Sequence, residues 1–112
     1  MNLNISETLA IEKRAKCRIN CDYPAMIKGT DMQGEKFAEQ ARVINLSKSG
    51  ILAVCKRPIR SGTEIYVKIA LPTGSLEWGV AKLATSGIVT RNDFFSDGSV
   101  AIAIKFQAYK FL

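Results

Sequence analysis

The chain has 112 residues, 47% of them hydrophobic, which is the size and composition of a single globular domain with its own core. Sixteen lysines and arginines against ten acidic residues give a net charge of +6, which favours anionic partners such as nucleotides, nucleic acids or phospholipid surfaces. No apolar run approaches the roughly 18–20 residues that span a bilayer, and the first residues contain no apolar core of a signal peptide. We therefore expect a cytoplasmic protein without membrane insertion.

The residues that usually carry catalysis and metal binding are scarce. The chain has no histidine and three cysteines, Cys17, Cys21 and Cys55. Their odd number and the lack of a CxxC spacing argue against a disulfide framework or a zinc site, and favour free thiols in a reduced compartment. Without histidine, the commonest metal ligand and the commonest general base are both missing. We predict no enzymatic activity, no metal and no cofactor.

The predicted elements begin after a short lead. Residues 1–12 are expected to form a flexible or short helical lead, and the β-domain then covers residues 13–112. The first strand is predicted at residues 18–27, where apolar and polar residues alternate. Pro24 restricts this strand to an edge, a bulge or a strand end, because proline cannot donate to a ladder. Residues 28–34 have the composition of a turn.

A hairpin is predicted next. Its strands are expected at residues 35–46 and 51–55, with the corner at residues 47–50. The apolar residues of the longer strand share one face with a period of two: Phe37, Ala41 and Val43. Residues 56–63 then form a basic connecting loop.

The last part of the chain contains the cleanest strand, at residues 64–71, whose apolar residues all face one way. Residues 76–90 are long enough for one bent strand or two. A hairpin loop with an Asp-Gly turn signal is predicted at residues 92–98, followed by a final strand at residues 100–106. Two glycines of the long stretch are candidate bulges: Gly79 and Gly87.

The fold class follows from this series of strands. Short strands at regular spacing, separated by turn signals, predict an all-β antiparallel sandwich or barrel. A closed barrel suits a chain of this size because closure removes exposed sheet edges.

Two short motifs carry the chemistry. Arg14 and Arg18 form an RxxxR motif before the first strand, and arginine is almost never fully buried without a partner. Asn45, Ser47 and Gly50 form an NxSxxG motif at the corner between the next two strands. Taken singly, the first motif fits a solvated basic face and the second fits a hairpin corner.

Taken together and in this order, the two motifs and the all-β layout resemble the PilZ family of cyclic di-GMP receptors. The resemblance covers about residues 12–106. It implies a six-stranded antiparallel β-barrel of the split-barrel type, with cyclic di-GMP as a ligand and not a cofactor. It also implies that Arg14 and Arg18 contact guanine and phosphate, while the residues of the second motif line the opposite wall.

The chemistry of the ligand is compatible with these residues. Guanine O6 and N7 are paired acceptors that match a guanidinium fork, and the flat cation can also stack on a purine. Asn45 stands where many family members have Asp, and a neutral amide holds the guanine N–H edge less strongly than a carboxylate. Lys13 adds a cation next to Arg14, and we hypothesise that it helps to hold two stacked ligand molecules. Only residues 107–112 remain for the family's C-terminal helix, which is expected to be missing or very short.

The sequence thus predicts a stand-alone bacterial receptor of a nucleotide second messenger, which changes conformation on binding and signals to a partner protein. One alternative is a PilZ-like interaction module that binds no ligand, for example in type IV pilus or motility assembly. Another is a small barrel that binds single-stranded nucleic acid through basic and aromatic residues. The arginines cluster beside one corner instead of following a groove, so we expect no DNA or RNA partner.

Overall fold

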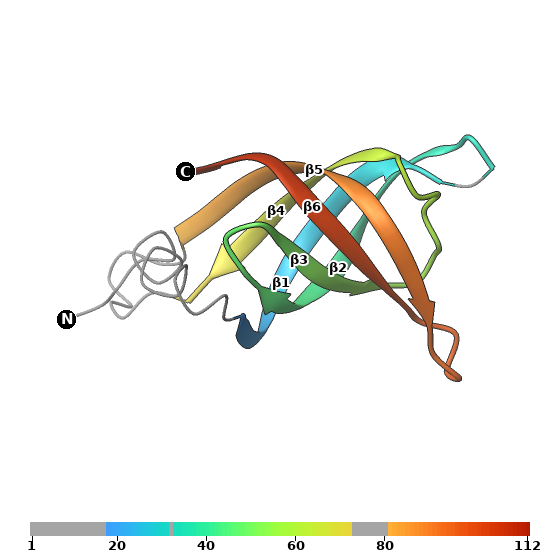
Figure 1. The fold of residues 1–112 in the computed structure, drawn as a ribbon, viewed down its shortest axis with the longest axis horizontal. Helices are drawn as coiled ribbons and strands as arrows, with labels where there is room; N and C mark the ends of the chain where they lie inside the picture. Colours follow the sequence, from blue (N-terminus) through green and yellow to red (C-terminus); the bar gives the residue numbers. More distant parts are fainter. Residues whose placement is uncertain (1–17, 32, 73–80) are drawn as a thin grey trace.

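A computed structural model of the chain describes residues 18–31, 33–72 and 81–112; the predicted lead at residues 1–12 lies outside them. The described residues form six antiparallel strands that close into a barrel in the order β1-β2-β3-β6-β5-β4 (Figure 1). The predicted six-stranded all-β barrel is confirmed. None of the described segments forms a helix with the length and hydropathy needed to cross a membrane. The strands are β1 (Ile19–Thr30), β2 (Lys36–Leu46), β3 (Gly50–Cys55), β4 (Glu64–Leu71), β5 (Ala81–Phe94) and β6 (Val100–Phe111).

The core fills the barrel with every second side chain of the strands. In β4 the four apolar residues at alternate positions are buried, while the residues between them are exposed or half-buried. Full burial of each such side chain contributes about 1.5–3 kcal/mol, so this face alone supplies a large part of the driving force for closure. The predicted apolar face of β2 is confirmed as well, with Ala41 and Val43 buried and Phe37 packed against the core. The buried residues of β4 are Ile65, Val67, Ile69 and Leu71.

Strand β1 accommodates Pro24 at the end of one of its two ladders. β1 pairs with β4 from Ala25 to Lys28, so Pro24 lies just beyond that ladder, where β2 is its one described neighbour strand. The register between β1 and β2 also shifts between Asn20 and Tyr23. Of the three predicted alternatives, an edge, a bulge or a strand end, Pro24 lies at a local edge on the β4 side, and the strand continues past it to Thr30.

The first turn is shorter than predicted. β1 continues to Thr30, so the turn expected at residues 28–34 begins only at Asp31. The carboxylate of Asp31 accepts hydrogen bonds from the backbone N–H groups of Gln33 and Glu35, at 2.9 and 3.0 Å. This carboxylate satisfies the backbone of the turn, and the residues before it remain free to extend the strand.

The last two strands end later in the chain than predicted. β5 continues to Phe94, and β6 pairs with it as far as Phe111, so the tail after residue 106 is strand and not a remnant of a helix. β6 continues past residue 106 because β5 is long enough to pair with it as far as Phe111. The register between β5 and β6 does shift next to Gly87, but Ser86 pairs with Ala108 and Gly87 pairs with Phe106, so the extra residue is Gln107 of β6 and the bulge predicted in β5 lies in its partner strand. Gly79, the other candidate bulge, lies outside the described residues.

Candidate functional site

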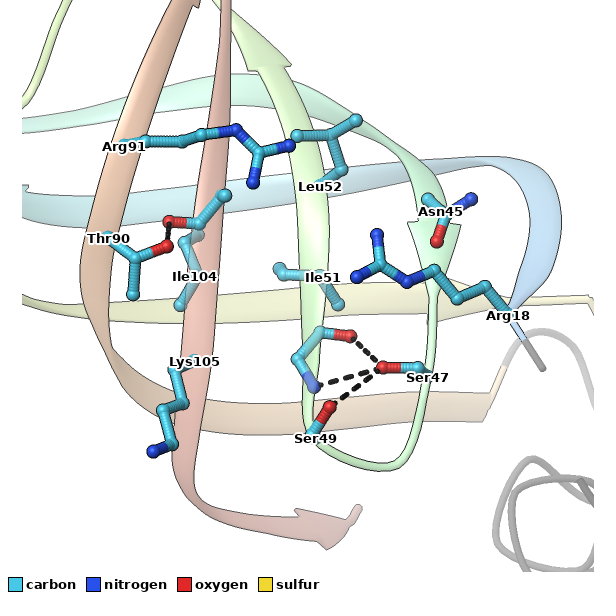
Figure 2. A pocket seen from close by; sticks show the side chains of 12 residues that line it. Arg18, Asn45, Ser47, Ser49, Ile51, Leu52, Thr90, Arg91, Ile104 and Lys105 are labelled. Atoms are coloured by element: carbon cyan, nitrogen blue, oxygen red, sulfur yellow. Dashed lines mark hydrogen bonds between the residues drawn. The ribbon is translucent and has the colours of Figure 1, made fainter. Parts of the chain in front are cut away.

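A pocket lies on the outer face of β3 and β6, between the start of β1 and the second half of β5 (Figure 2). Its volume is about 190 Å³. Arg18 of the first motif lines it together with all three residues of the second motif. Arg14 and Lys13 lie outside the described residues. The structure therefore brings together those predicted site residues that it describes: Arg18, Asn45, Ser47 and Gly50.

Asn45 reaches the pocket because β2 contains a bulge. Val43 is buried, and strict alternation would turn Asn45 inward as well. The register between β2 and β3 shifts between these two residues and leaves Ile44 as the extra one. Leu46 then takes the next buried position, and Asn45 faces the pocket. There its Nδ2 donates a hydrogen bond of 3.0 Å to Oδ1 of Asn20.

A second bulge, in β5, turns Arg91 into the same pocket. Val89 is buried, so strict alternation would place Arg91 inside the barrel. The register between β5 and β6 shifts between Val89 and Arg91, which leaves Thr90 as the extra residue. The next side chain, Asn92, bonds the loop before β4: it accepts from the N–H of Ile59 at 2.9 Å and donates to its carbonyl at 2.7 Å.

The two bulges place their polar residues at the ends of one cross-strand row. Asn45 pairs with Leu52, Leu52 pairs with Ala103, and Ala103 pairs with Arg91. Three strand spacings of about 4.8 Å separate the backbones of the two ends by about 14 Å. Figure 2 shows Arg18 extending toward β3 from the β1 side and Arg91 extending toward it from the β5 side. The site is therefore an apolar floor between two guanidinium groups.

The corner between β2 and β3 is held by Ser47. Its backbone N–H donates to the carbonyl of Gly50 at 2.9 Å. Its hydroxyl accepts from the N–H of Gly50 at 3.3 Å, donates to the same carbonyl at 3.2 Å, and lies 3.3 Å from the hydroxyl of Ser49. The hydroxyl thus stabilises the turn that carries the second motif.

Gly50 is required by the packing of β3 on β6. A Cβ atom at this position would lie 2.1 Å from the backbone carbonyl oxygen of Ile104. The carbonyl of the preceding Ser49 accepts a hydrogen bond of 2.8 Å from the N–H of Phe106, which holds the corner against β6. Close contact between two backbones therefore accounts for the glycine of the motif, whether or not a ligand also approaches it.

The pocket is electropositive. Arg18, Arg91 and Lys105 line it, and none of its described lining residues is acidic. Arg91 forms an ion pair of 3.0 Å with Asp93, but both side chains are about half exposed, so the pairing is weak. In the described ranges no group of three or more acidic or cysteine side chains is arranged to hold a metal ion. The electrostatics favour an anionic ligand.

Arg91 and Lys105 are site residues that the sequence analysis did not identify. The predicted strand ended at residue 90 and the predicted loop began at residue 92, so Arg91 belonged to neither. The alternation of apolar and polar residues in this strand could have identified Arg91. An arginine two residues after the buried Val89 requires a bulge, because a lone guanidinium is not buried in a small core.

Comparison with solved structures finds a similar fold in a structure described as the PilZ domain with c-di-GMP of YcgR from Escherichia coli. The similarity covers 81% of this chain and 75% of that chain, at 15% sequence identity and a TM-score of 0.49. No protein-family model matches the chain, and no curated protein is similar to it in sequence.

Proposed function

We propose that this chain is a receptor for cyclic di-GMP that changes conformation when the ligand binds and then signals to a partner protein. The observation that carries the proposal is the composition of the pocket. Arg18 of the RxxxR motif and the residues of the NxSxxG motif are far apart in the sequence, yet they line the same pocket. Binding and a change of shape are sufficient for this role, and no catalysed reaction is part of it.

The row of residues across β2, β3, β6 and β5 suits the chemistry of cyclic di-GMP, which has two phosphates and two guanines. The guanidinium groups of Arg18 and Arg91 match either a phosphate or the O6 and N7 atoms of guanine. Leu52 and Ala103 offer an apolar floor to a base. Oδ1 of Asn45 accepts no hydrogen bond from the described residues, and it can accept one from the N–H edge of guanine.

The size of the pocket supports a role for the residues that precede Arg18. Its volume of about 190 Å³ is below the roughly 300–1,000 Å³ of typical small-molecule sites, so most of a dinucleotide would project from it. In our proposal Lys13 and Arg14 cover the projecting part. Fixing each backbone residue costs about 1–2 kcal/mol, which charge-assisted bonds to the phosphates and guanines would offset. The closure of this segment over the ligand is the proposed conformational signal.

Isothermal titration with cyclic di-GMP tests the proposal. The proteins to compare are the wild type, Arg14→Ala, Arg18→Ala and the control Arg60→Ala, which removes an exposed arginine that does not line the pocket. We expect saturable binding by the wild type and the control, and its loss in the two motif variants. GTP and single-stranded DNA serve as control ligands.

Two results would change the interpretation. If the wild type does not bind cyclic di-GMP, the proposal is wrong and the PilZ-like interaction module takes its place. If one nucleotide binds per chain, the hypothesis that Lys13 helps to hold two stacked ligands is wrong, while the receptor function stands.

A further inference from the structure

A second hollow crosses the outer face of the barrel and shares no lining residue with the nucleotide pocket. It runs over β3, β2, β1 and β4 to the first residues of β5 and has a volume of about 550 Å³. A neighbouring hollow of about 440 Å³ shares Met26 and Lys68 with it. The order of the closed barrel places the β1–β4 pair across from the β3–β6 pair, which carries the nucleotide pocket. We call the two hollows together the basic groove, defined by Met26, Lys28, Arg42, Lys56 and Lys68.

The groove forms where the ladder between β1 and β4 ends. The last pair of that ladder is Ala25 with Ile69, and the residues just beyond it, Pro24 and Ala70, have short side chains. Their small size leaves an apolar depression in a surface that a barrel would otherwise make convex.

Met26 is the centre of the groove. Its side chain is 38% exposed, although it is large and apolar. It pairs across the sheet with Gln40 on one side and with Lys68 on the other, so it has polar neighbours on both strands. A partner with apolar side chains could cover this exposed surface of Met26. The flexible thioether of methionine suits such a surface because it adapts to the shape of a partner.

The rim of the groove carries more positive charge than negative charge. None of its described lining residues is acidic. Asp22 pairs with Arg42, but Lys28, Lys56 and Lys68 form no ion pair with a described residue. Because Lys28 pairs with Tyr66 and Lys68 pairs with Met26, the two lysines are diagonal neighbours on adjacent strands, about 7–8 Å apart. An anionic partner would relieve their repulsion.

We propose that the basic groove docks an acidic segment of a partner protein, in which carboxylates alternate with apolar side chains. The carboxylates would meet the lysines, and the apolar side chains would pack on Met26. Single-stranded nucleic acid fits less well, because such sites stack bases on aromatic rings. Among the lining residues the one aromatic is Tyr66, and a single ring does not provide the series of stacking surfaces that successive bases need. The groove and the nucleotide pocket share no lining residue: on β3 the groove takes Val54 and Cys55, while the pocket takes residues 50–52, so both can be occupied at once.

Fluorescence anisotropy with synthetic peptides tests this proposal. The probe is a labelled peptide in which Glu and Leu alternate, and the matched peptides replace Glu by Gln or Leu by Ser. The charge-reversed variant is Lys28→Glu with Lys68→Glu. Its control is Lys36→Glu with Arg60→Glu, which makes the same change in net charge at exposed residues outside the groove. Circular dichroism verifies that both double variants are folded.

We expect the Glu-Leu peptide to bind more tightly than either matched peptide, and to bind equally well when cyclic di-GMP is present. Charge reversal in the groove should weaken this binding at least about tenfold more than the control, because it sets like charges against each other. Failure of the Glu-Leu peptide to bind, or an equal loss in the two double variants, would overturn the proposal. Tighter binding of oligothymidylate or of phosphatidylglycerol vesicles to the same lysines would overturn it in favour of a nucleic-acid or lipid surface.

Discussion

The contact between Gly50 and β6 leads to a quantitative prediction for Gly50→Ala. The added Cβ would lie 2.1 Å from the carbonyl oxygen of Ile104, far inside van der Waals contact, and a backbone atom cannot rotate away as a flexible side chain can. Overpacking of this kind costs about 1–3 kcal/mol. The shift also strains the bond of 2.8 Å from the N–H of Phe106 to the carbonyl of Ser49, and a lost backbone bond costs about 0.5–1.5 kcal/mol. We expect the free energy of unfolding to fall by about 3 kcal/mol.

Chemical denaturation followed by circular dichroism measures the change in the free energy of unfolding, and thermal denaturation measures the change in Tm. At about 4 °C per kcal/mol for a domain of this size, Tm should fall by about 12 °C. The matched control is Ser49→Ala, which alters the neighbouring residue of the same turn but removes only an exposed hydroxyl. A Gly50→Ala protein as stable as the Ser49→Ala protein would refute the reasoning, and the glycine would then need another explanation, such as close approach of the ligand.

Three further predictions follow from the bulges and the turns. Arg91→Ala should weaken binding of cyclic di-GMP about tenfold in isothermal titration, as expected for one charge-assisted bond, while an unchanged affinity would exclude Arg91 from the site. Asn92→Ala removes both bonds to the buried Ile59 and should lower the free energy of unfolding by about 2–3 kcal/mol in urea titrations; a loss below about 0.5 kcal/mol would mean that water replaces the amide. The pKa of Asp31 is lowered, chiefly by the backbone N–H of Glu35 and also by Arg57, so its stabilising effect is present above the usual carboxyl pKa and is lost as the pH falls through the lowered value. Asp31→Asn should therefore flatten the acid limb of a stability–pH curve, and a limb of unchanged slope would contradict this.

The fold could be predicted from the sequence because its main signal is local. The alternation in residues 64–71 predicts both ends of β4 correctly, because its apolar side chains all point into the barrel interior. The ends of β1 and β6 could not be predicted in the same way. They depend on how long a neighbouring strand continues, and β6 extends past residue 106 because β5 pairs with it.

The candidate site could be predicted only in part, because its geometry depends on register. The motifs identify Arg18, Asn45 and Ser47 by their spacing, but strict alternation would bury Asn45 beside Val43. A bulge can be recognised only when the pairing of two strands is known, and the sequence of β2 alone does not show which residue of β3 each of its residues pairs with. The same limitation concealed Arg91. A polar residue at a position where strict alternation predicts burial is therefore a sign of a bulge.

The two bulges also explain how a closed barrel can carry a candidate binding site. A barrel of this size fills its interior with side chains, so a ligand must bind on the outside, where a regular surface is convex. The bulges at Ile44 and Thr90 lie on either side of the β3–β6 pair and turn Asn45 and Arg91 out at the two ends of one row. Two polar groups of the candidate site, Asn45 and Arg91, therefore come from breaks in the regular alternation, while the β3–β6 pair between them supplies the floor. For this reason, substitutions in the floor should change affinity through packing, and substitutions at the bulges should change which ligands are recognised.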